Sequence, residues 1–157
     1  MKVIFVLILM ISFACPLQAS NAINFRVELS GGNEVPPIAI DTSGAAILHV
    51  DHNLSEIRVK LTVRDGDAVL GAAGSHFHCA PAGQNGPVVA FVAGSFPPGY
   101  DGDFEIRATL TDASIINTTT ACGGTIAELV DAMLDGNVYL NVHSTDHPGG
   151  VVRGQVE

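Results

Sequence analysis

Positive charge is scarce in this chain of 157 residues, where seven Lys and Arg oppose 16 Asp and Glu for a formal net charge of −9. This balance argues against nucleic-acid binding, which needs a basic surface, and against attraction to anionic lipid. The chain also lacks a nucleophile elbow, a phosphate-binding loop and a dinucleotide fingerprint. Asp101 and Asp103 flank a glycine, but the spaced oxygen ligands of a calcium loop do not follow them. The commonest enzyme signals are therefore missing, and binding is favoured over catalysis.

Long apolar runs are equally scarce, since the one that exists spans Val3–Ala14 and directly follows Lys2. A basic residue, a short apolar core and then small residues are typical of a secretory signal peptide. Cleavage is expected after Ala19 or Ala22, so we predict a signal peptide at 1–22 and one domain at 23–157. The run is too short to span a bilayer comfortably. We expect an exported protein without a transmembrane segment, placed in the periplasm, at the cell surface or in the medium.

Cysteine is limited to three residues, Cys15, Cys79 and Cys122. Cys15 lies in the signal segment, where the leucine usual three positions before a lipidated cysteine is missing, so removal with the signal is favoured over a lipid anchor. The remaining even pair in an exported chain predicts a disulfide between Cys79 and Cys122. Metal ligation by Cys79 is the alternative, but neighbouring strand residues face opposite ways and Cys79 should point away from His78.

Short segments with alternating apolar and polar residues recur along the chain and predict β-strands. The clearest alternation sets Ile57, Val59, Leu61 and Val63 against polar neighbours. The strands are expected at 24–29, 45–50, 57–64, 72–79, 88–92, 104–110, 138–143 and 151–156. One segment differs, because 126–134 has apolar residues at helical spacing behind a Thr125–Glu128 capping box. We predict an all-β protein, an antiparallel β-sandwich or Greek-key-like barrel with one short helix at about 126–134.

Two histidine patterns lie in these strands, His76-Phe77-His78 and Asn141-Val142-His143. Alternate strand residues share a face, so His76 and His78 project together, as do Asn141 and His143. Three imidazoles suit copper or zinc better than metals that prefer oxygen. The alternative is that these histidines are structural and bond to loop backbone. Asn141 could orient a ligand imidazole or satisfy backbone groups.

Other polar residues carry weaker signals. His147, in a Gly- and Pro-rich turn, is a weak candidate for a fourth ligand, and His49 and His52 are expected on the surface. Arg153 alternates with Val152 on the last strand, so it should leave the core face. Pairing with a loop carboxylate is favoured there, and the alternative is that Arg153 steers anions toward the site. Glu34 precedes Pro36-Pro37 and is expected to cap loop amides.

Three motifs in order give the chain a family resemblance. They are Gly32-Asn33-Glu34-Val35-Pro36-Pro37, then Ser75-His76-Phe77-His78 with Gly83-Gln84-Asn85-Gly86-Pro87, and finally Tyr139-Leu140-Asn141-Val142-His143 leading into Val152-Arg153-Gly154-Gln155. The chain resembles the CHRD domain, the module named after chordin and also found alone in bacterial exported proteins. The resemblance covers nearly all of 23–157 and implies an extracytoplasmic β-sandwich in which the Asn141–His143 strand lies next to His76 and His78. It specifies the fold better than the function.

A second and fainter resemblance is to copper/zinc superoxide dismutase, which also has a His-x-His strand and a late Val-His strand. By that analogy His76, His78 and His143 would be copper ligands. The bridging histidine and zinc cluster of the dismutases have no counterpart, because no His lies between Cys79 and Tyr139. The leading hypothesis is thus an exported binding protein with a copper or zinc site. The alternatives are a dismutase-like redox enzyme and a metal-free interaction module at the cell surface that binds another extracellular protein.

Overall fold

The computed structural model describes residues 22–69, 74–94 and 100–157. Eight antiparallel strands form one sheet in the order β5-β4-β7-β8-β1-β2-β3-β6. Their bounds are Ile23–Ser30 (β1), Ser43–Val50 (β2), Ile57–Val69 (β3), Ser75–Cys79 (β4), Val88–Ala93 (β5), Tyr100–Leu110 (β6), Val138–Val142 (β7) and Val152–Val156 (β8). All eight expected strands are confirmed, although 72–73, the start of the fourth, lies outside the described residues.

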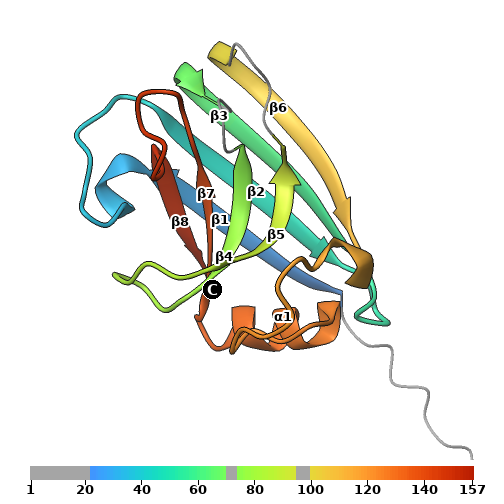
Figure 1. Ribbon diagram of the computed structural model, residues 1–157. Coiled ribbons are helices and arrows are strands. Elements are labelled where there is room, and N and C mark those ends of the chain that lie inside the picture. Colours follow the sequence, from blue (N-terminus) through green and yellow to red (C-terminus); the bar gives the residue numbers. More distant parts are fainter. Residues whose placement is uncertain (1–21, 70–73, 95–99) are drawn as a thin grey trace, which may run out of the picture.

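The sheet curls into a nearly closed barrel, so the expected all-β fold is confirmed (Figure 1). Its two four-stranded halves join at a narrow seam, where β1 and β8 share the single residue pair Ser30–Arg153. In the described part of the chain, each of the remaining six pairs of neighbouring strands is joined at four or more positions. The halves can therefore fold toward each other like the layers of a sandwich while remaining one sheet.

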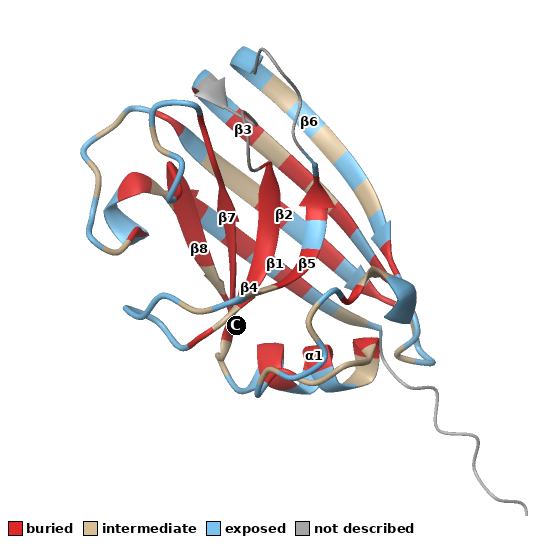
Figure 2. Ribbon diagram, in the orientation of Figure 1, coloured by how far each residue is buried: buried red, intermediate tan, exposed pale blue. Residues whose placement is uncertain are grey.

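A single apolar core fills the space between the two halves. It includes Phe25 and Leu48 from one half and Phe77, Leu140 and Val152 from the other, all buried. Most strands contribute alternate residues to this core, as the sequence pattern predicts, whereas β5, whose pairing with β4 is irregular, contributes the adjacent residues Val89 and Ala90. The outer faces differ between the halves: Figure 2 shows β4, β7 and β8 buried along almost their whole length, whereas β1, β2 and β3 alternate between buried and more exposed residues and β6 is exposed or intermediate up to its last residue.

The predicted helix, α1 (Ile126–Leu134), packs across one end of the barrel (Figure 1). Its buried stripe includes Ile126, Leu129 and Met133. Thr125 caps the helix as expected, since its side chain accepts a hydrogen bond from the Glu128 N–H, and the Glu128 carboxylate accepts in return from the Thr125 hydroxyl at 3.0 Å and from the Gly124 N–H at 2.8 Å. Two short 3₁₀ helices, η1 (Gly31–Asn33) and η2 (Asp112–Ser114), complete the described elements.

The predicted disulfide joins Cys79 to Cys122, with 5.8 Å between the two Cα atoms. It ties the end of β4 to the segment that precedes α1. Cys79 is therefore not available as a metal ligand beside His78. The predicted signal peptide, with Cys15, lies outside the described residues. No helix among the described residues is long and apolar enough to cross a membrane.

Candidate metal centre

Strand register places two polar rows across the outer face of β4, β7 and β8. His76 pairs with Asn141, which pairs with Arg153, and one step along His78 pairs with Tyr139, which pairs with Gln155. The intervening row consists of Phe77, Leu140 and Gly154 and faces the core. The outer face of this half of the sheet is thus polar, yet loops cover it and bury its side chains.

Three histidines converge on this covered face. His76, His78 and His143 can each offer a ring nitrogen such that all three nitrogens lie within 4.8 Å of one another. The closest approach is 3.1 Å, between His76 Nδ1 and His143 Nε2. All three rings are buried. The three histidines therefore meet, although their nitrogens are spread over up to 4.8 Å rather than the about 4 Å expected for ligands of one ion, and the cluster could hold a metal ion.

Backbone carbonyls fix the proton position on two of the rings. The Nδ1 atom of His143 lies 3.0 Å from the Pro148 carbonyl oxygen, and that of His78 lies 2.9 Å from the Gly86 carbonyl oxygen. A carbonyl oxygen only accepts, so each Nδ1 must carry the hydrogen and donate it. Each Nε2 then keeps its lone pair. Ligand histidines in metal sites are commonly held in this way by their second nitrogen.

The site also favours neutral imidazoles. Burial lowers the pKa of His78, an effect that hydrogen bonding to Gly86 and Asn141 only partly offsets. Burial likewise lowers the pKa of His143. A histidine must be neutral to bind a metal, so both rings are already in the required protonation state at neutral pH.

Asn141 lies against the cluster, with its Oδ1 position 3.0 Å from His143 Nε2. Asn141 is thus next to the atom that would bind a metal. His147 is not brought into the cluster, and its carbonyl instead accepts backbone hydrogen bonds from Ser144 and Gly150.

Aromatic rings enclose the cluster on two sides. Phe91 of β5 meets His76 edge-on, with 4.5 Å between ring centroids, and shields it from solvent although Phe91 itself is 44% exposed. Tyr139 stacks on His78, with centroids 4.7 Å apart and an interplanar angle of 8°. The sequence analysis did not assign a role to either aromatic residue. Tyr139 alternates with Asn141 and His143 along the strand, so the sequence places it on the same face as the histidines. Its contact with the cluster could therefore have been predicted.

Arg153 lies beyond Tyr139. Its guanidinium carbon is 3.4 Å from the centre of the Tyr139 ring, which therefore separates it from His78. As expected, Arg153 leaves the core face, but it is 1% exposed and donates hydrogen bonds to Asn85 Oδ1 and the Pro81 carbonyl rather than to a carboxylate. Burial lowers its pKa, but its usual pKa is so high that it stays charged at neutral pH.

Glu34 carries a buried carboxyl group that is attracted by Arg153, the arginine for which a carboxylate partner was expected. Only 5% of Glu34 is exposed, and among the described residues its Oε1 atom makes no hydrogen bond. Burial raises its pKa from 4.5 to about 7, against the opposing attraction of Arg153. Gly150 makes this arrangement possible, because a Cβ there would lie 2.5 Å from Glu34 Oε1 and 2.8 Å from Asn141 Nδ2. The expectation that Glu34 simply caps loop amides missed this burial.

A barrel-like antiparallel domain with a covered histidine cluster is the class of protein that the fold and the site define. The family model of the CHRD domain matches residues 25–156, and the chain belongs to this family. No curated protein and no solved structure matches the chain.

Proposed function

We propose that this protein binds one copper or zinc ion through His76, His78 and His143 in an extracytoplasmic compartment. The observation that carries the proposal is the convergence of three buried imidazoles, two of which have their Nδ1 hydrogens fixed on backbone carbonyls. Copper and zinc are favoured because imidazole suits both, and the cluster contains no carboxylate among the described residues. The amino-terminal signal pattern supports export.

Each part of the surroundings has a role in this proposal. The Pro148 and Gly86 carbonyls orient the rings of His143 and His78, so little movement is needed to present both Nε2 lone pairs. Phe91 and the covering loops keep bulk water from the cluster. Three protein ligands leave a further coordination position for water or a small ligand.

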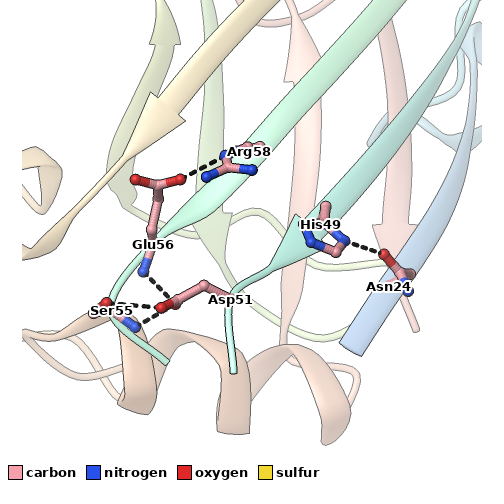
Figure 3. Close-up of polar contacts among 6 residues, drawn as sticks. All are labelled: Asn24, His49, Asp51, Ser55, Glu56 and Arg58. Carbon is pink, nitrogen blue, oxygen red and sulfur yellow. Dashed lines mark hydrogen bonds and ion pairs between the residues drawn. The ribbon is translucent and has the colours of Figure 1, made fainter. Parts of the chain in front are cut away.

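The test is calorimetric titration of the untagged mature protein with copper and with zinc. Wild type should bind one ion, and His78→Ala should lose more than about 100-fold in affinity, since removal of a mere supporting contact already costs 10–100-fold. His49→Ala is the matched control: His49 is also a strand histidine, but it bonds Asn24 Oδ1 at 2.7 Å on the open face (Figure 3). It should bind like wild type.

Affinity should fall at acid pH with a defined onset. Burial lowers the pKa of His78 and His143 below 6.5, so protons compete with the metal only below that pH. Affinity should stay level above about pH 6.5 and decline beneath it. Binding that is equal in wild type and His78→Ala would refute the site. Absence of binding to wild type would leave the histidines structural and favour a metal-free interaction module.

The alternative of a dismutase-like redox enzyme has one supporting feature, the buried cation Arg153 one ring away from His78. An assay of superoxide consumption by the copper-loaded protein distinguishes this alternative from binding alone. Binding without turnover would exclude it.

A further inference from the structure

The exposed positive charges of this acidic protein all lie on one face. Lys and Arg occur six times after residue 22, and five of these residues line the open outer face of β1, β2, β3 and β6: Arg26, Arg58, Lys60, Arg64 and Arg107. The sixth is the buried Arg153. We refer to these five side chains and the strand surface between them as the basic face. Figure 3 shows one end of it, where Arg58 pairs with Glu56.

The basic face is hollowed rather than flat. One hollow of about 430 Å³ is lined by Arg26, Lys60 and Arg64, and a second of about 380 Å³ by Arg58, Lys60 and Arg107. Ile47 and Lys60 border both hollows, so they form one trough across four strands, about 14 Å long at the usual strand spacing. Glu28 lines the first hollow, and Glu56, Asp103 and Glu105 lie beside the trough in ion pairs with its cations.

The charge pattern of the trough contrasts with that of the remaining surface. Its five cations are paired with four carboxylates, Glu28, Glu56, Asp103 and Glu105. Within residues 23–157, the other twelve acidic residues are opposed only by Arg153. A surface that serves solubility alone would not need to gather every exposed cation on one sheet face.

The ion pairs of this face can be exchanged for a ligand. Four of the five cations have side chains at least 65% exposed, and Lys60 is 41% exposed. Exposed pairs of this kind contribute little to stability, so an incoming carboxylate can replace a protein carboxylate at small cost. Arginine is suited to this exchange because its guanidinium binds a carboxylate through two hydrogen bonds.

The floor of the trough indicates the chemistry of the occupant. Ile47 is 48% exposed and gives an apolar surface, while Ser43 and Thr62 add hydroxyl groups and Glu28 an acceptor. A partner that bears carboxylates, hydroxyls and apolar ring faces matches all of these groups. A thin chain can also stay within the trough, whereas a nucleic-acid duplex or an acidic globular protein would extend over the strongly acidic remainder of the surface.

We propose that the basic face binds a linear acidic polysaccharide of the uronate type. Its carboxylates bind the arginines and Lys60, its ring faces lie on Ile47, and its hydroxyls bond to Thr62 and Glu28. This activity is separate from the metal site, because the basic face lies on the other half of the sheet.

Affinity gel electrophoresis and calorimetry of the mature protein test the proposal, with polygalacturonate as probe and neutral dextran as reference. Wild type should bind polygalacturonate and not dextran, and salt should weaken the binding. The double variant Lys60→Gln with Arg107→Gln should lose at least about tenfold in affinity, since it removes two charged contacts.

The matched control adds two negative charges away from the basic face, by Ala121→Glu with Leu134→Glu, and thus changes the net charge equally. Both positions are exposed near α1. This control should bind like wild type, and circular dichroism should show both variants folded. Any of three results would overturn the proposal: no binding by wild type, equal weakening in both double variants, or binding of polyphosphate or DNA in preference to polygalacturonate.

Discussion

Glu34 should make the folded state less stable as the pH rises. Its carboxyl is buried without a hydrogen bond to Oε1, and its pKa is raised from 4.5 to about 7. Between these two values the folded protein holds a proton that the unfolded chain releases. The contribution of Glu34 to stability is therefore complete below about pH 4.5 and is lost as the pH rises through 7.

The size of this effect follows from the displacement of the pKa. A difference of about 2.5 pKa units, at about 1.36 kcal/mol per unit, corresponds to about 3 kcal/mol between pH 4.5 and pH 8. Arg153 attenuates the effect, and its attraction is already included in the raised value. Such a loss is a large part of the stability of a domain of this size.

Glu34→Gln is the matched test, because the amide has nearly the same shape and does not ionise. We expect urea denaturation at several pH values to show the variant gaining stability relative to wild type from pH 5 to pH 8, by up to about 3 kcal/mol. His78 and His143 have lowered pKa values and act in the opposite direction below pH 6.5, but they are present in both proteins and cancel in the difference. A difference that does not change with pH would show that the carboxyl is ionised in the fold and that the reasoning is wrong.

Four further substitutions test the packing. Phe77→Ala empties a fully buried core position and should cost about 3–5 kcal/mol of unfolding free energy in urea titrations, whereas Phe91→Ala, at an exposed position, should cost much less. Cys122→Ser opens a loop with a sequence separation of 43 residues and should cost about 4 kcal/mol, measured against wild type with its disulfide intact. Gly154→Ala would place a Cβ 2.5 Å from the Glu28 carbonyl oxygen, so thermal melting should occur at a clearly lower temperature. A Gly154→Ala protein as stable as wild type would contradict the close approach of β8 to β1.

The strands and the helix could be predicted because their signals are local. Alternation in 57–64 identifies one buried and one exposed face without knowledge of the neighbouring strands, and Thr125 and Glu128 mark the helix start within one turn. The choice between sandwich and barrel was not predictable, since it depends on the single Ser30–Arg153 pair that joins the halves. That pair unites residues more than a hundred positions apart.

For the candidate site, the positions of the histidines could be predicted from the sequence, but the burial of the residues around them could not. His76 and His78 share a face by parity alone, and the family resemblance suggested that His143 lies near them. The burial of Glu34 and Arg153 was not predictable, because it depends on which loops fold over the outer face. Sequence alternation separates the core face from the other face, but it does not show whether the other face is covered by loops.

The pairing of β4 with β7 also affects how the protein folds. His76 and His143 are 67 positions apart, yet they meet because these two strands are neighbours in the sheet. Contacts between such distant segments form slowly, since a long loop must close first. A partly folded chain that has only the β1–β2–β3 hairpins lacks the cluster altogether. An ion held there would consequently stabilise the fully folded protein and not its intermediates, by about 1.4 kcal/mol for each tenfold excess over the dissociation constant.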